Sequence, residues 1–227
     1  MDGHGPVAAE AAGASKPYRK RKGEGHERRE EILAAARSVF VAEGYEHATI
    51  RKIAAKAGVS STALYLYFPD KDAILLEICD KAFGKLVARF EAIRNDGGTL
   101  VERLRRLMEA YLRFGLAHPD EYRLIFMTKQ AIPMPFDHRT GADMPQGTPG
   151  ANGAKAFAGL RDLVSALIQD GTLKGEDPNL MAEVIWASGH GLVSLLITMP
   201  TFHWSPVDQL IPAMIDAQLN GVLRKAG

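Results

Sequence analysis

Hydroxyl and phenol side chains are concentrated in one short stretch of the chain, which runs from Thr49 to Lys71. It reads TIRKIAAKAGVSSTALYLYFPDK, so that a tight Ala57-Gly58-Val59 turn separates two short helical patterns. Two helices that meet at a steep angle through a short turn containing Gly form a helix-turn-helix, whose second helix enters a DNA major groove. Short hydroxyls and flat phenols on that helix can bond to base edges and phosphates. The stretch therefore predicts a DNA-binding surface.

The first residues of the second helix are the candidate base readers, because the N-terminal part of a recognition helix contacts bases. They are Ser60, Ser61, Thr62 and Ala63. Capping alone would explain Ser60, whose hydroxyl can accept a hydrogen bond from a first-turn amide. Ser61 and Thr62 are the better candidates, and the Ala63 methyl could meet a thymine methyl.

Contacts to phosphates are expected around the same two helices. Thr49 would cap the first helix, whose N-terminal amides can also face a phosphate. Lys71 lies in the first turn of the following helix, where the helix dipole disfavours a positive charge. A phosphate opposite Lys71 would explain this position, and a solvated lysine is the alternative. Arg51 and Lys52 either contact the DNA backbone or form a solvated face.

The elements that must position these residues all read as helices. A stripe that includes Ile32 and Phe40 predicts a first helix, and Gly44 stands where it would stop. Asp70 can cap a long fourth helix with an apolar stripe as far as Phe90. Later helical patterns cover residues 99–118, 119–127, 154–169, 180–198 and 207–223, and residues 131–153 read as a long irregular loop. We find no alternating strand pattern, so the expected fold class is all-α.

The composition sets broad limits on the kind of protein. A chain of 227 residues with a net charge of +1 can hold one large or two small domains. The single cysteine, Cys79, excludes an intramolecular disulfide and fits a reducing cytosol. No secretory signal is apparent at the N-terminus. The most apolar segment, residues 181–199, contains Glu183 and His190, so it reads as a buried helix rather than a membrane span. We expect a cytoplasmic protein without a membrane partner.

Three regions are predicted from these patterns. Residues 1–25 form a disordered basic tail, whose Lys16–Lys22 cluster could reach a flanking minor groove or could only aid solubility. Residues 26–72 form the helix-turn-helix domain. Residues 73–227 form a second helical domain.

Residues 27–90 resemble the N-terminal domain of the TetR family of transcriptional regulators. The resemblance lies in the helix 29–40, Gly44-Tyr45, Thr49-Ile50, Ile53-Ala54, Ala57-Gly58-Val59-Ser60, Leu64-Tyr65 and Tyr67-Phe68-Pro69-Asp70-Lys71. In that family the positions that match Tyr65 and Tyr67 touch phosphate. Because two residues two apart cannot share a helix face, the alternative is that one packs inward and the other is merely exposed.

The second half of the chain resembles one TetR-like subgroup with a Trp-His-Gly type of C-terminal domain. The matching residues are Trp186, His190-Gly191 and Leu192, together with the segment from His118-Pro119 to Phe126-Met127. The family resemblance implies a homodimer, a palindromic operator in double-stranded DNA, and release or rearrangement on binding a small-molecule effector. Repression is the commoner outcome in the family, and activation stays open.

An effector cavity and a dimer interface are both expected in the second half. Mixed aromatic and Met positions suggest a largely apolar cavity, with ordinary core packing as the alternative for each residue. The candidates are Met108, Tyr111, Phe114, Phe126, Met127, Trp186 and His190. His190 reads as a hydrogen-bonded core histidine, a ligand contact, or a metal or haem ligand. The helices 180–198 and 207–223 carry more apolar surface than one core face needs, so they would form the dimer interface.

No motif for catalysis is apparent. The seven His residues are scattered, and no pair of ligands has zinc spacing. Gly189-His190-Gly191 is neither a nucleophile elbow nor a dinucleotide fingerprint. We therefore expect a protein that is not an enzyme and has no metal or cofactor. The alternative function is a small-molecule binding protein whose helix-turn-helix is vestigial.

Overall fold

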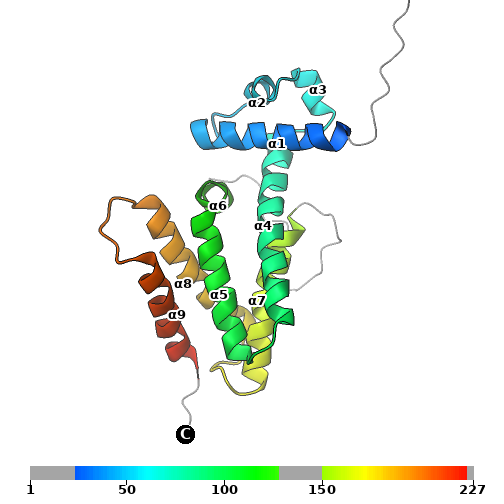
Figure 1. Cartoon of the computed structure of the whole chain (residues 1–227). Helices are drawn as coiled ribbons and strands as arrows, with labels where there is room; N and C mark the ends of the chain where they lie inside the picture. Colours follow the sequence, from blue (N-terminus) through cyan, green and yellow to red (C-terminus); the bar gives the residue numbers. More distant parts are fainter. Residues whose placement is uncertain (1–23, 128–149, 224–227) are drawn as a thin grey trace, which may run out of the picture.

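The computed structural model describes residues 24–127 and 150–223, and these residues form a small upper lobe above a larger lower lobe (Figure 1). The all-α prediction is confirmed. The upper lobe contains α1 (Glu24–Glu43), α2 (Ile50–Lys56), α3 (Ser61–Tyr65) and the start of α4 (Lys71–Asn95). The lower lobe contains the rest of α4 with α5 (Leu100–Ala117), α6 (Pro119–Phe126), α7 (Ala151–Gln169), α8 (Pro178–Thr198) and α9 (Val207–Val222). The predicted basic tail and most of the predicted loop lie outside the described residues.

Side-chain caps fix the starts of the helices that build the upper lobe. Thr49, Ser60 and Asp70 each accept a hydrogen bond from the backbone N–H three residues later, at 3.3, 3.0 and 2.7 Å. These are the caps that the sequence predicted, and each satisfies an amide that would otherwise lack a partner. Gly44 ends α1 with a φ of +79°, a conformation that glycine adopts without a steric penalty.

Two hydrophobic cores meet along α4. Ile74, Leu75 and Ile78 of α4 pack into the upper core with residues of α1, α2 and α3. From Ala82 onwards the same helix packs into the lower core against α5, α7 and α8. Leu124 of α6 also belongs to the upper core. The upper core thus extends beyond residue 72, the predicted end of the helix-turn-helix domain.

One side of α8 is packed and the other is exposed, so the prediction of a buried helix was only half right. Among the described helices, α8 is long and apolar enough to cross a membrane by length and composition alone, and 28% of that window is buried. Its inner side carries Ile185 and Val193, which are buried. Its outer side leaves apolar residues exposed at helical spacing. They are Leu180, Val184, Leu195 and Met199.

Gly115 of α5 allows three helices to approach closely. A Cβ atom at this position would lie 2.6 Å from Val193 Cγ1 and 2.9 Å from the Tyr122 ring. Both neighbours are fully buried, so neither can move aside without a wider shift. We expect Gly115→Ala to lower the free energy of unfolding by about 1–3 kcal/mol, as measured by chemical denaturation.

Gly159→Ala is the matched control for that prediction. Gly159 lies on the exposed side of α7, and its nearest neighbour would be Phe90 Cδ2 at 4.0 Å. Since alanine favours the helix over glycine by up to about 1 kcal/mol, this variant should be as stable as the parent or more stable. Equal stability of the two variants would contradict the close approach at Gly115.

Candidate DNA-binding surface and ligand cavity

The predicted base-reading residues lie on α3, at the upper end of the molecule (Figure 1). Leu64 is fully buried and anchors this short helix to the upper core. Thr62 is exposed, and the phenol of Tyr65 is 55% exposed, so both can meet a partner from solvent. The half-buried members of the predicted set are Ser61, Ala63 and Tyr67. Within α3, Thr62 and Tyr65 are therefore the exposed members of the predicted set, and Ser60, the N-cap residue, is exposed directly before them.

Leu66 is a candidate contact that sequence reasoning missed. It directly follows α3 and is 77% exposed, more than any other large apolar side chain among the described residues. A leucine beside exposed hydroxyl and phenol groups could meet a thymine methyl in the major groove. The sequence contained a signal for this exposure. Leu64 and Phe68 fill the buried positions on either side, so Leu66 between them has no core position to occupy.

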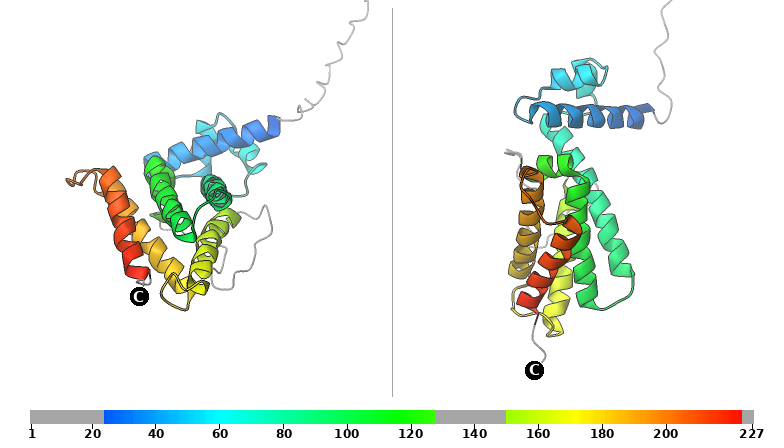
Figure 2. Two further views of the ribbon diagram at one scale, coloured as in Figure 1. Left: turned by 60° about the horizontal axis from the view of Figure 1, so that its bottom comes forward. Right: turned by 60° about the vertical axis from the view of Figure 1, so that its left-hand side comes forward.

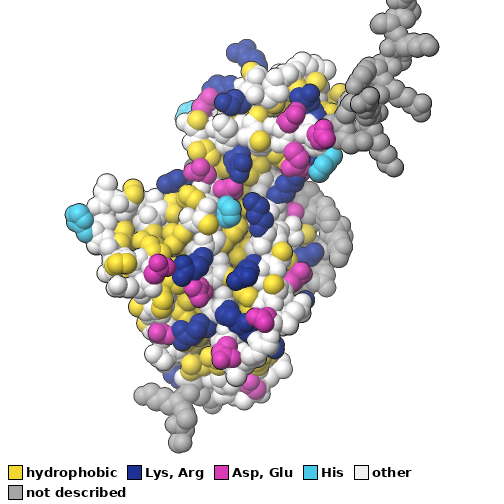
Figure 3. Space-filling view, in the orientation of Figure 1, with side chains coloured by type: hydrophobic (Ala, Val, Ile, Leu, Met, Phe, Trp, Pro, Cys, Tyr) yellow, Lys and Arg dark blue, Asp and Glu magenta, His cyan; other side chains and the backbone are white. Residues whose placement is uncertain are grey.

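The start of α2 offers two basic side chains, which differ in their local partners. Lys52 forms an ion pair with Glu43 at 2.5 Å and donates a hydrogen bond to the His47 carbonyl at 3.1 Å. Arg51 is exposed and makes no ion pair with another described residue. Figure 3 shows Lys and Arg side chains at the upper end of the molecule. Arg51 is thus better placed than Lys52 to contact phosphate.

Lys71 has partners within the protein that explain its position in the first turn of α4. Its ammonium donates to the carbonyls of Tyr45 and Ala48, at 3.1 and 3.5 Å, and lies 4.3 Å from the centre of the Tyr45 ring. The Tyr45 hydroxyl in turn donates to the carboxylate of Asp72. The helix dipole penalty is therefore offset without a phosphate. Lys71 holds the loop that precedes α2. Its contact with phosphate stays a prediction.

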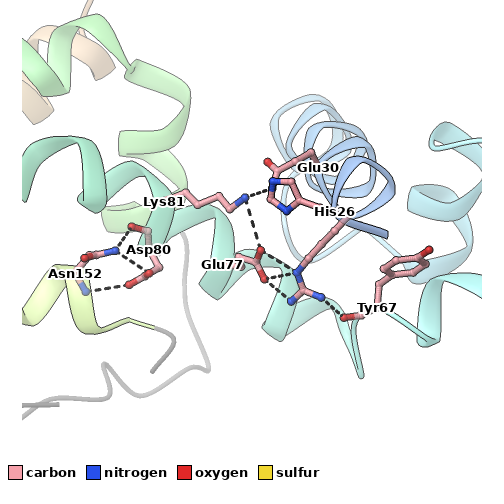
Figure 4. A network of polar contacts seen from close by, with 8 residues as sticks. His26, Glu30, Tyr67, Glu77, Asp80, Lys81 and Asn152 are labelled. Atoms are coloured by element: carbon pink, nitrogen blue, oxygen red, sulfur yellow. Dashed lines mark hydrogen bonds and ion pairs between the residues drawn. The ribbon is translucent and has the colours of Figure 1, made fainter. Parts of the chain in front are cut away.

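Arg29 of α1 holds the turn between α3 and α4, and sequence reasoning gave it no such role. Its guanidinium binds the Glu77 carboxylate with two nitrogens, at 3.0 and 2.5 Å (Figure 4). It also donates to the Tyr67 carbonyl at 2.6 Å and lies 4.1 Å from the centre of the Phe68 ring. A planar guanidinium suits these partners because it can stack and bond in two directions at once. Arg29 thereby fixes the backbone of half-buried Tyr67, two residues after the exposed Tyr65.

Asp80 joins α4 to the first turn of α7 (Figure 4). Its carboxylate accepts hydrogen bonds from the backbone N–H of Asn152 at 3.0 Å and from the Asn152 side-chain amide at 2.9 Å. The first of these bonds takes the place of a side-chain cap, because Gly150, the N-cap residue of α7, has no side chain that could accept a hydrogen bond from a first-turn N–H. This contact sets the position of α7 against α4.

A cavity of about 310 Å³ lies in the middle of the lower lobe, between α4, α5, α6, α7, α8 and α9. Four of the predicted effector residues line it, namely Met108, Tyr111, Phe126 and Trp186. Sequence reasoning missed other parts of the wall. They include Phe83, Leu86, Phe90, Phe157, Leu160, Glu183, Ile185 and Met214. The apolar spacing along α4 and α7 was visible in the sequence, but it could not distinguish a wall from a filled core.

Phe114, Met127 and His190 were predicted for the cavity, and the structure places them outside its described wall. Phe114 packs its ring on His118, with centroids 5.0 Å apart. Met127 caps the end of α6. His190 contacts Tyr122 through a hydrogen bond and through its ring. This contact fits the role of a hydrogen-bonded core histidine, which is one of the three roles predicted for His190.

A chain of three hydrogen bonds runs from the cavity wall to His190. The indole Nε1 of Trp186 donates to the Tyr111 hydroxyl at 3.1 Å. The hydroxyls of Tyr111 and Tyr122 are 3.0 Å apart, and the Tyr122 hydroxyl lies 2.6 Å from His190 Nδ1. The residues come from α5, α6 and α8. These bonds satisfy polar atoms in a largely apolar core, where an unpaired group would be costly.

Burial sets the protonation of this chain. It raises the pKa of the Tyr111 phenol and, more strongly, that of the Tyr122 phenol. It lowers the pKa of His190, because the charged imidazolium is disfavoured away from water. Both phenols therefore keep their protons near neutral pH, and His190 is neutral. Burial likewise raises the pKa of Cys79 to about 12, so its thiol is unreactive at neutral pH.

No group of three or more His, Cys, Asp or Glu side chains that could hold a metal ion occurs within residues 24–127 and 150–223.

Comparison with known families decides between the possible functions of this surface and cavity. Residues 32–78 match the family model described as bacterial regulatory proteins of the tetR family. Residues 104–218 match the model of the tetracyclin repressor-like C-terminal domain, which by itself spans half of the chain. The chain belongs to the TetR family. It is therefore a DNA-binding transcriptional regulator, as the helix-turn-helix predicted.

Two relatives of this TetR-family chain are named regulators. The HTH-type transcriptional regulator RutR of Escherichia coli K12 is 29% identical over 178 residues, which cover 78% of each chain. The HTH-type transcriptional activator FasR of Mycolicibacterium smegmatis is 36% identical over 100 residues, which cover 44% of this chain and 46% of that one.

Solved structures share the fold of this TetR-family chain. A protein of unknown function from Rhodococcus sp. RHA1 is 24% identical, with a TM-score of 0.67 over 92% of this chain and 100% of that one. The fatty acid degradation regulator FadR of Bacillus halodurans is 20% identical, with a TM-score of 0.65 over 89% and 98% of the two chains. At these identities the likeness concerns the fold alone.

Proposed function

We propose that this TetR-family regulator is a homodimeric repressor that binds a palindromic operator and is released by a small, largely apolar effector. The single observation that carries the DNA part is the exposed α3 surface, whose Thr62 and Tyr65 are accessible while Leu64 anchors them from below. Arg29 and Lys71 hold the segments on either side. A recognition helix presented in this way can enter a major groove.

Dimerisation through α8 and α9 is supported by the apolar outer side of α8. Leu180, Val184, Leu195 and Met199 repeat at the spacing of one helix face and are all exposed. Figure 3 shows apolar side chains gathered over the side of the lower lobe where α8 and α9 lie, and Figure 2 shows both helices at the same edge. A large exposed apolar patch marks an interaction surface. A palindromic operator has twofold symmetry, which a twofold dimer of this chain would share. We therefore assign the exposed patch of α8 to a second copy of the chain.

The cavity supports the effector part of the proposal. Its wall joins α4 and α6, both of which also pack into the upper core. Glu121 of α6 forms an ion pair with Arg37 of α1 at 2.5 Å. A ligand that moves these helices would therefore change the position of the DNA-binding lobe. Such a movement is required if effector binding is to change the affinity for the operator.

The other parts of the proposal follow from the relatives and from the site. The named relatives are transcriptional regulators, so we assign a cytoplasmic, non-enzymatic role without a cofactor or a membrane partner. Activation is the second candidate outcome, because the relative FasR is named an activator. The exposed Thr62 hydroxyl and Tyr65 phenol of α3 favour an active helix-turn-helix over a vestigial one, because a scaffold without DNA contacts does not need them.

Mobility-shift titrations with operator variants selected from random DNA test the proposal. We expect Tyr65→Ala and Lys71→Ala each to weaken binding about tenfold or more across all sequences. In a homodimer each substitution removes two of the proposed contacts to phosphate, one from each subunit. Thr62→Ala should instead change the order of preference among operator variants. Lys71→Ala should also reduce the salt dependence of binding.

Lys85→Ala is the control for these variants, since Lys85 is an exposed lysine in the lower part of α4. It should bind as the parent does. Unchanged binding by Tyr65→Ala, Lys71→Ala and Thr62→Ala together would remove the proposed docking of α3.

A further inference from the structure

The direction of the hydrogen-bond chain behind the cavity is not fixed by its geometry. Trp186 can only donate, so the Tyr111 oxygen accepts from the indole in every arrangement. The two remaining bonds, from Tyr111 to Tyr122 and from Tyr122 to His190, can each run either way. Which way they run depends on which nitrogen of the neutral His190 ring carries the proton.

In the forward arrangement every donor points towards His190. Tyr111 donates to Tyr122, and Tyr122 donates to His190 Nδ1, so the imidazole proton resides on Nε2. The Tyr111 hydroxyl then has no proton left for the cavity. Its oxygen can still accept a bond from a ligand hydroxyl.

In the reverse arrangement His190 carries its proton on Nδ1 and donates to Tyr122, which donates to Tyr111. The proton of Tyr111 is now free to bond to a ligand carbonyl. To change direction the two phenol hydroxyls rotate, one proton leaves Nε2 to water, and one is bound at Nδ1. The net charge of the ring stays the same, and half-buried His190 is open enough for this exchange.

The charge of the wall narrows the ligand further. Among its described residues Glu183 is the only one that carries a charge, and none is Lys, Arg or His. From these residues a ligand carboxylate or phosphate would gain no positive partner to offset the hydration that it loses on entry, which is unfavourable. An apolar molecule loses little and gains contact with aromatic rings such as those of Phe126, Phe157 and Trp186.

We propose that the cavity binds an uncharged, mainly apolar molecule with one hydroxyl or carbonyl oxygen, which bonds to the Tyr111 hydroxyl. The chain from Tyr111 to His190 takes the direction that this oxygen requires. The inference rests on the proposed function only in so far as this cavity is the effector site. The Tyr122 contact places the response on α6, the helix that also reaches the upper core through Leu124.

Three matched probes test the preference for an oxygen, with the full chain free of DNA and binding followed by calorimetry. They are 2-acetylnaphthalene, 1-(2-naphthyl)ethanol and 2-ethylnaphthalene, which share one skeleton and differ in a carbonyl, a hydroxyl or neither. We expect the ketone and the alcohol to bind about fivefold more tightly than the hydrocarbon, because each makes one net hydrogen bond. Tyr111→Phe should remove this preference and leave hydrocarbon binding within about twofold.

Tyr45→Phe is the control, because it removes a phenol hydroxyl that bonds to Asp72 in the upper lobe. It should keep the preference. Equal affinities of the parent for the three probes, a preference that survives in Tyr111→Phe, or no binding of any probe would each overturn the proposal.

Nitrogen-15 NMR of the histidine rings tests the direction of the chain. With the ketone bound, the His190 proton should lie on Nδ1, because a carbonyl can only accept a hydrogen bond; with the alcohol bound, either ring nitrogen can carry it, because a hydroxyl both donates and accepts. In Tyr122→Phe the position of the His190 proton should not depend on the ketone, which still binds because Tyr111 keeps its proton. A His190 ring that carries its proton on Nε2 while the ketone is bound to the parent protein would overturn the coupling. Operator binding is measured separately, so a protein that shows the preference but binds no DNA overturns the regulator proposal alone.

Discussion

Replacing both Val184 and Leu195 with aspartate is expected to yield a monomer and to weaken operator binding by at least about 100-fold. Both side chains lie on the exposed apolar side of α8, about three helical turns apart. In a twofold dimer the double change brings four carboxylates into an apolar interface, where each would be desolvated without a partner. A monomer contacts one half-site and loses the contribution of the second. Sedimentation and mobility-shift titrations measure the two effects.

Ala88→Asp is the matched control for that prediction. Ala88 is exposed on α4, so this variant places one aspartate, half of the added charge, on a surface that we assign to no interface. This variant should remain dimeric and bind the operator as the parent does. A double variant that still sediments as a dimer would show that α8 does not form the interface.

Tyr122→Ala is expected to lower the free energy of unfolding by about 3–5 kcal/mol, the range for loss of a buried aromatic ring. The ring is fully buried and lies 4.7 Å from Phe126 and 5.5 Å from His190, measured between centroids. Its removal opens a cavity in the core and also leaves Tyr111 and His190 without their shared partner. Chemical denaturation followed by circular dichroism measures the change.

Tyr122→Phe separates the two contributions, because it keeps the ring and removes only the hydroxyl. Its cost should be about 1–3 kcal/mol, the penalty for unsatisfied buried polar groups. If Tyr122→Ala were no less stable than Tyr122→Phe, the packing of the ring would contribute nothing and the prediction would be wrong.

Local chemistry explains why the upper lobe could be predicted from the sequence. Thr49, Ser60 and Asp70 accept hydrogen bonds from amides three residues away, so a cap can be predicted from a few neighbouring residues. Arg29 and Glu77 are 48 residues apart, and nothing local to either residue points to the other. The role of Arg29 in holding the Tyr67 backbone therefore appears only once α1 and α4 are placed together.

The lower lobe shows the same limit in a different form. An apolar spacing predicts which side of a helix faces inward, and it did so for α4. Whether the space behind that side is filled depends on the angles at which six helices meet. Phe83 and Phe157 therefore entered the cavity wall unpredicted, and Phe114 fell outside it. The composition of α8 likewise indicated apolar surface without telling which part of it the chain itself would cover.

The continuity of α4 has a consequence for how the molecule melts. Ile74, Leu75 and Ile78 of this helix belong to one core, and Ala82, Phe83, Leu86 and Phe90 belong to the other. Helix formation is cooperative, so fraying at one end removes hydrogen bonds that support the next turn. When heat unfolds one lobe, the other lobe therefore loses the part of its core that α4 supplies. We expect the two lobes to unfold as a single thermodynamic unit, so that neither persists as a stable fragment once the other has unfolded.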